Sequence, residues 1–572
     1  MSNQRLITLS AKTSFGLAIL FVVSALQIGC EPAATAPGLS SNDAEPHDFY
    51  FPTTGVGVDR EAVLFAIDNY LLPQRENLTV YLSKPSCRQE PVLTGDTDNP
   101  LAPDQVGTSF YGTVLNDDGK FRMWYYAMRL NEPGDAHRID ITNLLQGPVC
   151  YAESTDGIDW TKPSLGQVEI RGSKDNNAIL LPDSSTQAAF VIKDLEDPDP
   201  QRRYKMVYNA HTSNRGDSGK PGAPETGTWV TRTATSPDGW QWEAAAEYAT
   251  DQFIEGSSFY HFNGLYVVNG QRLLPSEGGH PGGRQGSAIS SVRFDGKWLP
   301  GHTEAFLLPE PEDPAERGQT GRYAQVHLGV GGVSYGNVVV GLYGLWYNEP
   351  GDFNPEQRWS WFGYGKTSGD LGLVFSNDGL HFREPVKGHV FISRFDSPAT
   401  PIEGENSPTI LCQTGNAILN VGDETRIYFG RWRNAAYNQG LTVEVALATL
   451  PRDRWGAVGL YPKDAARDVY RDRGSIWSAP VRIPSAGCRV VLNADHTGLM
   501  SIEVSDAKFQ LLPDYSAEQS GKLTEDSGLD CPITWQTKDL SALGGQTVRF
   551  KVNMRDGKDV SPRLYAVYLR SE

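Results

Sequence analysis

The residue best placed to do acid–base chemistry is Glu255, which lies in the stretch I-E-G-S-S-F-Y-H-F-N-G-L-Y-V-V-N-G-Q from Ile254 to Gln271. Two runs rich in aromatic and β-branched residues flank the turn pair Asn263-Gly264, and this pattern predicts a β-hairpin. Glu255 would then stand at the start of the first strand, at the edge of a cavity. A carboxyl group held there can stay protonated as a general acid if burial raises its pKa. The alternative is that Glu255 is one of many solvated acids.

The composition narrows the class of protein and of partner. The chain has 572 residues and a formal net charge of −18 at pH 7. No basic patch could neutralise phosphates, so we expect no nucleic-acid partner. Aromatic residues make up 10% of the chain, which also contains 59 Gly and 37 Pro. This composition favours many short strands separated by turns, and we therefore expect an all-β protein that binds neutral polymers or small polar ligands.

An internal repeat predicts the architecture. A serine, an Asp-Gly turn and an aromatic residue recur in S-T-D-G-I-D-W, S-P-D-G-W-Q-W and S-N-D-G-L-H-F, and F-D-G-K-W and R-D-R-W are weaker copies. The spacing of about 74 residues suits a four-stranded antiparallel blade with long loops, and the repeated aspartates are Asp156, Asp238, Asp295, Asp378 and Asp453. We predict a five-bladed β-propeller over residues 48–460. The repeats are interpreted as architecture, in which Asp-Gly closes a hairpin and the aromatic residue packs between blades.

The two ends of the expected propeller have different patterns. Residues 461–476 are rich in charge and predict a linker, and the alternating strands of residues 477–572 predict a small β-sandwich. Upstream of the first blade, the apolar segments 62–72 and 77–82 are expected to help close the ring.

The N-terminus predicts export. In residues 1–30, Arg5 and Lys12 precede an apolar run that is short for a membrane span, as in a signal peptide. The run ends in Q-I-G-C, which resembles a bacterial lipobox with Cys30 as the lipidated residue. A lipid on Cys30 would anchor the protein to the cell envelope, at the outer membrane, and would be its only contact with a membrane. Without the lipid we expect a periplasmic or secreted protein. Residues 31–47 predict a flexible tether.

Five other cysteines remain in this compartment. Disulfides can form there, and we predict one between Cys488 and Cys531, because both lie in the expected sandwich. The odd number leaves at least one free thiol. No C-x-x-C or H-E-x-x-H spacing occurs, which disfavours a structural zinc site.

Five blades followed by a sandwich resemble the five-bladed propeller glycoside hydrolases, a group that includes arabinanases, β-xylosidases, invertases and anhydrogalactosidases. The segment from Cys150 to Pro163, C-Y-A-E-S-T-D-G-I-D-W-T-K-P, is similar to uncharacterised bacterial members. In arabinanase and xylosidase relatives the general acid is the Glu of an E-G-P motif before a strand that ends in G-x-Y-Y. The sequence E-G-S at Glu255 to Ser257 and N-G-L-Y at Asn263 to Tyr266 match it, with Ser in place of Pro. The resemblance implies that Glu255 is the acid of a glycosidase.

The family's other two carboxylates have no direct counterpart here. The base or nucleophile should open the first inner strand, and Asp104 is the nearest candidate, although it could equally be an exposed loop acid. The second-blade aspartate should precede A-F-V-I, where Thr186 and Gln187 stand, and Asp194 follows that strand. His327 in V-H-L-G-V-G-G-V is either a core residue or, as in some anhydrogalactosidase-like relatives, a catalytic acid or ligand.

Further residues could line the mouth of the cavity and bind substrate. Trp346 and Trp432 either stack on sugar faces or pack between blades, and the full set of candidates is Asp251, Gln271, Trp346, Glu405 and Trp432. No cofactor is predicted. The resemblance leaves an axial Ca²⁺ open, because some relatives have one, but no ligand set in this sequence is distinctive.

Two functions remain open at this point. One is a glycoside hydrolase acting on oligo- or polysaccharide in the cell envelope, with Glu255 as acid and Asp104 or Asp194 as base or nucleophile. The other is a non-catalytic glycan-binding surface lipoprotein that kept the propeller and lost the acid–base pair.

Overall fold

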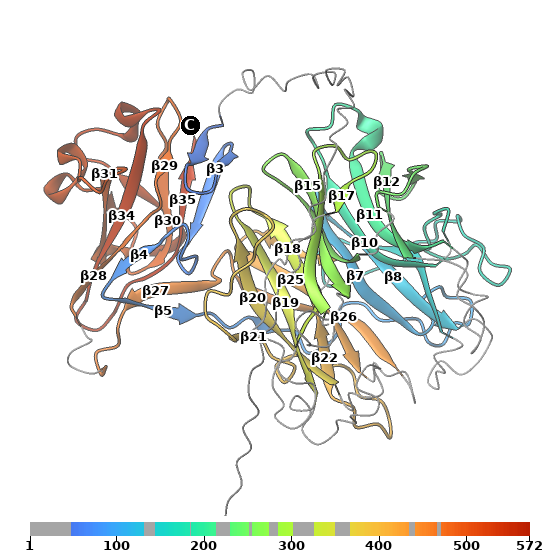
Figure 1. Ribbon diagram of the computed structural model, residues 1–572. Coiled ribbons are helices and arrows are strands. Elements are labelled where there is room, and N and C mark those ends of the chain that lie inside the picture. Colours follow the sequence, from blue (N-terminus) through green and yellow to red (C-terminus); the bar gives the residue numbers. More distant parts are fainter. Residues whose placement is uncertain are drawn as a thin grey trace, which may run out of the picture. The chain divides into compact units, whose positions relative to one another are not determined.

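The computed structural model describes residues 47–130, 144–183, 185–212, 229–250, 254–273, 284–300, 325–348, 367–413, 415–433, 441–465 and 471–571. These residues form β-strands joined by turns, with only a few short 3-10 helices, so the all-β prediction is confirmed (Figure 1). Within these ranges no helix is long and apolar enough to span a membrane. The predicted export signal, its lipidation site Cys30 and most of the tether lie outside the described residues.

Five antiparallel sheets follow one another along the chain. Sheet 1 contains β7 (Gly107–Asp117), β8 (Lys120–Leu130) and β9 (Leu144–Ser154). Sheet 2 contains β10 (Thr186–Lys193), β11 (Tyr204–His211), β12 (Trp229–Ser236) and β13 (Glu243–Ala244). Sheet 3 contains β14 (Glu255–Phe262), β15 (Leu265–Leu273), β16 (Arg284–Ser291) and β17 (Leu299–Pro300). In each, the described strands pair in sequence order.

Sheets 4 and 5 complete the series. Sheet 4 contains β18 (Gln325–Ser334), β19 (Val339–Asn348), β20 (Thr367–Ser376) and β21 (Val390–Ile392). Sheet 5 contains β22 (Thr409–Cys412), β24 (Ile418–Val421), β25 (Glu424–Arg433), β26 (Thr442–Pro451) and the early strand β6 (Ser86–Cys87). A single parallel pair between Gly369 and Ile410 joins these two groups into one nine-stranded sheet.

The first strands of neighbouring sheets contact one another through polar groups. Between sheets 1 and 2, Thr113 Oγ1 donates to the carbonyl of Ala189 at 3.2 Å and accepts the N–H of Val191 at 2.8 Å. Asn416 then bridges sheets 2 and 3, because its Nδ2 donates to the carbonyls of Val191 at 3.2 Å and Phe259 at 2.6 Å. These bonds satisfy buried backbone groups and fix how the neighbouring first strands align along their length.

The same chain of contacts continues through sheets 4 and 5 and returns to sheet 1. Ser258 Oγ of β14 donates to the carbonyl of Val330 in β18 at 2.7 Å. Gln413, just after β22, donates from Nε2 to the carbonyl of Gly329 at 2.9 Å. The short strand β23 (Gly415–Asn416) pairs in parallel with β7. Contacts therefore run in order through β7, β10, β14 and β18 to the segment after β22, where β23 pairs with β7.

The Asp-Gly repeats join each sheet to a neighbouring one. In the three full copies, the hydroxyl of the repeat serine or the carboxylate of the repeat aspartate accepts backbone N–H groups of the turn. The carbonyl of the turn glycine accepts a hydrogen bond from an aromatic side chain of the adjacent sheet, in the pairs Gly157 with Tyr428 at 2.8 Å, Gly239 with Trp124 at 2.8 Å and Gly379 with Tyr260 at 2.7 Å. These contacts agree with an architectural role for the repeat.

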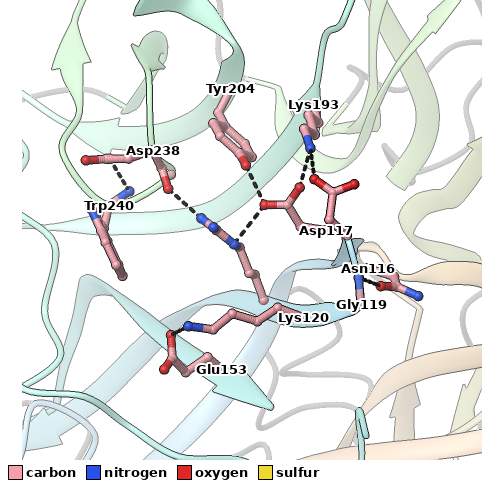
Figure 2. A network of polar contacts seen from close by, with 12 residues as sticks. Asn116, Asp117, Gly119, Lys120, Glu153, Lys193, Tyr204, Asp238 and Trp240 are labelled. Carbon is pink, nitrogen blue, oxygen red and sulfur yellow. Dashed lines mark hydrogen bonds and ion pairs between the residues drawn. The ribbon is translucent and has the colours of Figure 1, made fainter. Parts of the chain in front are cut away.

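Carboxylates at the ends of first strands make a second kind of link. Asp117, at the end of β7, accepts hydrogen bonds from Tyr204 and Lys193 of sheet 2 (Figure 2). Arg122 Nε lies 2.9 Å from Asp117 Oδ2. Asp194, which directly follows β10, makes the same kind of link, because it accepts the hydroxyl of Tyr266 in sheet 3.

The remaining strands form two seven-stranded sheets. One orders β2 (Val56–Val58), β1 (Phe49–Phe51), β29 (Val481–Arg482), β34 (Thr547–Arg555), β28 (Arg473–Trp477) and β4 (Gln74–Glu76), with β31 (Met500–Asp506) also on β34. The other orders β32 (Lys522–Leu523), β33 (Ser527–Thr534), β30 (Arg489–Asp495), β35 (Arg563–Arg570), β27 (Gly456–Leu460) and β5 (Leu78–Leu82), with β3 (Glu61–Phe65) also on β35. Most buried apolar residues of both sheets belong to one core, which also contains residues of sheets 4 and 5 such as Leu342, Phe375 and Phe429.

The pairing of the N-terminal strands differs from the expectation that they close the ring. β3 and β5, which lie within the segments expected to do so, pair with β35 and β27, and Figure 1 draws these blue strands with the red β35 and the orange β27. The segment expected as a linker, 461–476, contains most of β28. The apolar alternation of these segments predicts strands, but it cannot specify a partner some 500 positions away in the chain, because pairing follows from tertiary packing.

The predicted disulfide between Cys488 and Cys531 is not formed in the structure. Both are buried free thiols. Cys531 lies opposite Leu492 on β30, four residues along the strand from Cys488. That offset is about 13 Å at the rise of a β-strand, beyond the roughly 7 Å that a disulfide can span between Cα atoms.

Candidate active site

Glu255 is the first residue of β14, where it pairs with Gln271 of β15. Its side chain is partly buried, and Gln271 Nε2 donates to Glu255 Oε2 at 2.6 Å. Among the described residues, no group donates to the other oxygen, Oε1. The carboxyl group is therefore oriented by one amide and keeps one oxygen for another partner.

Asn209 of sheet 2 holds the backbone on both sides of Glu255. Its Oδ1 accepts the N–H of Gly256 at 2.9 Å, and its Nδ2 donates to the carbonyl of Ile254 at 2.9 Å and to Thr231 Oγ1 at 3.2 Å. The only signal for this residue in the sequence is an Asn inside the apolar strand Y-K-M-V-Y-N-A-H. We did not predict it.

A buried thiol lies close enough to Glu255 to be affected by its charge. Cys412, in β22, is fully buried, and burial followed by the negative charge of Glu255 raises the pKa of its thiol well above the usual range. Cys412 shares an apolar cluster with Ile254, the residue before Glu255. The same cluster contains Tyr111 and Trp432, whose rings stack with centroids 6.0 Å apart.

The two tryptophans predicted to bind substrate belong to that cluster. Trp346 is 1% exposed and Trp432 is 5% exposed. The Trp346 indole N–H also donates to the carbonyl of Leu411 at 3.3 Å. Burial to this extent favours packing between sheets over stacking on a sugar face.

Asp104 has a different environment from the one predicted for a catalytic base. Its carboxylate is 1% exposed, Lys162 Nζ lies 2.5 Å from Oδ2, and the Tyr125 hydroxyl donates to the same oxygen at 2.7 Å. Tyr125 and Tyr126 are neighbours on β8 and belong to different apolar clusters, and only the Tyr126 cluster contains Cys412. Because side chains alternate along a strand, the Asp104 ion pair lies on the face of β8 opposite to the one that Tyr126 occupies.

Asp194 lies at the other end of the hairpin from Glu255. Its Oδ2 accepts the Tyr266 hydroxyl at 2.7 Å and lies 2.8 Å from Lys205 Nζ. Burial would raise the pKa of Asp194, but hydrogen bonds from Lys205 and Tyr266 hold it below the usual value. Tyr266 pairs with His261, six residues along β14 from Glu255, or about 20 Å. Carboxyl groups in glycosidases lie at most about 9.5 Å apart, so Asp194 cannot act with Glu255.

The remaining candidates are partly outside the described residues. Asp251 lies outside them, as does the side chain of His327, whose backbone pairs with Gly344 in β19. Glu405 is partly exposed and accepts the Ser407 hydroxyl at 2.9 Å. No contact in the described chain joins Glu405 to Glu255.

The backbone of His327 lies near the start of β18, and Glu255 lies at the start of β14. Val330 accepts from Ser258, as described above, and His327 and Glu255 both precede that contact in their strands, with a register shift in between. β14 and β18 are neighbours in the ring of contacts. These are the two predicted catalytic residues that the fold brings to one edge.

The second strand of each of the five sheets ends at that edge and the third strand begins there, with 8 to 18 residues between the two along the chain. At the opposite edge, sheets 1, 3 and 5 turn within the pairs Asp118-Gly119, Asn263-Gly264 and Gly422-Asp423. Because binding residues concentrate where long loops leave a rigid scaffold, the Glu255 edge is the candidate functional edge.

The described residues offer no metal centre. No group of three or more His, Cys, Asp or Glu residues among them is arranged to hold an ion. The axial Ca²⁺ that the family resemblance leaves open therefore has no ligand set in this part of the chain, and we assign it no role.

Comparisons with known proteins place the chain near carbohydrate-active structures without assigning it. No family model and no curated protein matches the sequence. Similar solved structures include a glycoside hydrolase with a TM-score of 0.35 and 12% identity, covering 64% of this chain and 92% of that one. The β-1,2-mannobiose phosphorylase of Listeria innocua has a TM-score of 0.34 and 13% identity, with 66% and 97% covered. The GH32 β-fructofuranosidase of Bombyx mori has a TM-score of 0.30 and 11% identity, with 79% and 89% covered. At TM-scores below 0.5, these likenesses assign neither fold nor function to this chain.

Proposed function

We propose that sheets 1 to 5 are the blades of a five-bladed β-propeller and that the two seven-stranded sheets form a β-sandwich beside it. The order of contacts from β7 through β10, β14 and β18 to the segment after β22, and the pairing of β23 with β7, support the ring. The strand order within each of the two larger sheets supports the sandwich, and their shared apolar core continues into sheets 4 and 5. In this proposal the segment 49–82 belongs to the sandwich, and β6 completes the fifth blade.

We propose further that the protein is a glycoside hydrolase with Glu255 as its general acid. The observation that carries this proposal is the way Glu255 is held, by Gln271 on its carboxylate and by Asn209 on its backbone, at the edge with the long connections. The Gln271 amide requires Glu255 Oε2 as an acceptor, so a proton on the acid would reside on Oε1. From there it can pass to the oxygen of the leaving sugar as the glycosidic bond breaks and water adds to the anomeric carbon.

The second catalytic group is neither Asp104 nor Asp194 in this proposal. Asp104 is neutralised by Lys162, and Asp194 is at the wrong end of the hairpin. His327 is the candidate that remains among the predicted residues, because its backbone lies near the start of the adjacent first strand, as that of Glu255 does in β14. A neutral imidazole there could act as the base that activates water.

The engagement of Asp104 and Asp194 in ion pairs also favours a second candidate function. A protein with one acid at this edge could bind glycans without cleaving them. The two functions share the same ligand class and the same surface.

The deciding experiment uses a panel of 4-nitrophenyl glycosides and of plant and algal oligosaccharides. The wild type is expected to hydrolyse at least one, and Glu255→Gln, which keeps the size of the side chain but cannot donate a carboxyl proton, is expected to bind that glycan and fail to cleave it. Equal turnover by both proteins would remove Glu255 from the mechanism. Calorimetric binding by a wild type that cleaves nothing would establish the second function.

We also propose that the protein is exported and held on the cell envelope by a lipid on Cys30. The lipobox-like Q-I-G-C ending supports this proposal. Cells expressing the wild type and fed an alkyne fatty acid should yield a labelled protein in the membrane fraction, whereas Cys30→Ser should be unlabelled and soluble. Label on the Cys30→Ser protein would contradict the proposal.

A further inference from the structure

A bulge separates Glu255 from the regular part of its strand. The register between β14 and β15 shifts between Gly256 and Ser258, so Ser257 is an extra residue without a partner on β15. Such a bulge interrupts the ladder of hydrogen bonds, although Glu255 and Gly256 still pair with Gln271 and Gly270. A contact from another element can therefore add to what fixes the backbone at Glu255.

Asn209 supplies such a contact from sheet 2. It is 2% exposed, and one amide holds both peptide neighbours of Glu255, as described above. Gly256 permits this approach, since a Cβ there would lie 2.7 Å from the ring of Phe190 and 3.4 Å from Asn209 Oδ1. The glycine of the E-G-S motif is therefore explained by close contact with the neighbouring sheet.

We propose that Asn209 is a positioning residue, which sets the backbone at Glu255 and through it the place of the carboxyl group. It touches no reacting atom. An effect of Asn209 on catalysis rests on the proposed function, but its positioning of the Glu255 backbone can be tested without a substrate.

A second asparagine provides a matched control. Asn337 is 1% exposed, its Oδ1 accepts the N–H of Val63 at 2.9 Å, and its Nδ2 donates to the carbonyl of Val63 at 2.8 Å. It makes the same two backbone bonds, but to β3 in a different sheet. Replacing either asparagine with alanine leaves comparable buried peptide groups unpaired, so the two variants are expected to lose similar stability.

The Cys412 thiol can report where the Glu255 charge lies. Glu255 is the charged group that acts on this buried thiol. The S–H stretching band of Cys412, identified by its loss in Cys412→Ala, shifts when that charge is removed in Glu255→Gln. We expect Asn209→Ala to move the band toward its position in Glu255→Gln and Asn337→Ala to leave it at the wild-type position.

Turnover gives the second measurement. On the 4-nitrophenyl glycoside that the wild type cleaves fastest, Asn209→Ala is expected to lower kcat on the order of 10²-fold with little change in KM, because a misplaced acid costs the chemical step. Asn337→Ala should leave kcat unchanged. Asn209→Ser, a smaller change that retains a hydroxyl, serves if the alanine variant does not fold.

The outcomes separate this inference from the proposed function. An unshifted Cys412 band in folded Asn209→Ala or Asn209→Ser would overturn the positioning role, whatever the activity. A shifted band in a protein that hydrolyses no glycan would uphold the positioning role while the glycosidase proposal fails.

Discussion

At the scale of single residues, the partners of an acid decide what it can do. Glu255 accepts one described hydrogen bond, from a neutral amide, whereas Asp194 accepts from an ammonium group and a phenol. Both acids adjoin a first strand, and the local sequence gave no reason to separate them. The fully buried Lys205, which also lies 2.7 Å from Asp197 Oδ2, makes Asp194 part of a structural network.

Removing the ammonium group of Lys205 from that network should lower the free energy of unfolding. Lys205→Met leaves the carboxylates of Asp194 and Asp197 without their ammonium partner, and loss of one member of a buried ion pair costs about 3–5 kcal/mol. Urea unfolding should show a loss of this size in the free energy of unfolding. Lys193→Met, whose ammonium is 24% exposed beside Asp117, should cost clearly less. Equal losses in the free energy of unfolding would show that the burial of Lys205 does not decide the cost of removing its ammonium group.

Acid should weaken the same network through Asp197. Burial would raise the pKa of Asp197, but hydrogen bonds from Lys205, the N–H of Asp199 and Arg202 lower it to about 2. An unfolded aspartate titrates near about 3.9, so this group stabilises the fold above pH 4 and the contribution is lost as the pH falls toward 2. In Asp197→Asn the free energy of unfolding should be lower at pH 7 and should fall less steeply between pH 4 and 2. The exposed Asp159→Asn is the control and should follow the wild type.

At the scale of elements, four of the five first strands have a register shift near their start. Register shifts occur in β7, β10, β14 and β18, between Ser109 and Thr113, Gln187 and Ala189, Gly256 and Ser258, and His327 and Val330. A bulge turns side chains away from the alternation of a regular strand. These bulges also explain why the alternation of apolar and polar residues could not predict which side chains near Glu255 face the neighbouring first strands.

The repeat turns should be sensitive to the neighbouring sheet. Gly239 and Gly264 both have left-handed backbones, with φ of +85° and +77°, so alanine strains either turn by roughly 1 kcal/mol. A Cβ on Gly239 would also lie 3.0 Å from the ring of Trp124, whereas nothing lies within 4 Å at Gly264. We expect Gly239→Ala to lower the melting temperature more than Gly264→Ala. Equal shifts would indicate that the indole moves aside without cost.

At the scale of the whole molecule, the two ends of the described chain fold together. β3 lies on β35 over residues 61–65, and β4 and β5 pair with β28 and β27. The sandwich proposed above is therefore built from segments before and after the five sheets. About 500 residues separate β3 from β35 along the chain, so the contact is highly non-local.

This arrangement predicts the effect of a truncation. Deleting residues 1–82 removes β1 to β5 and exposes the apolar faces and edges of β27, β28 and β35, so the product is expected to aggregate on expression. Deleting residues 1–46, which precede the described strands, should leave a soluble protein with the thermal stability of the mature chain. A soluble, cooperatively folded product from the longer deletion would show that the C-terminal sheets do not need the N-terminal strands.

The sequence by itself determined the class of the fold and its internal period. Strand alternation and Asp-Gly turns are local signals, so they predicted the all-β character, the hairpin at Asn263-Gly264 and the position of Glu255 at a strand start. The tertiary structure alone decided the partners: Lys162 for Asp104, Lys205 for Asp194, Asn209 for the backbone of Glu255, and β35 for β3. These contacts join residues far apart in the chain, and no local pattern of apolar and polar residues specifies which distant surface a strand or a charge will meet.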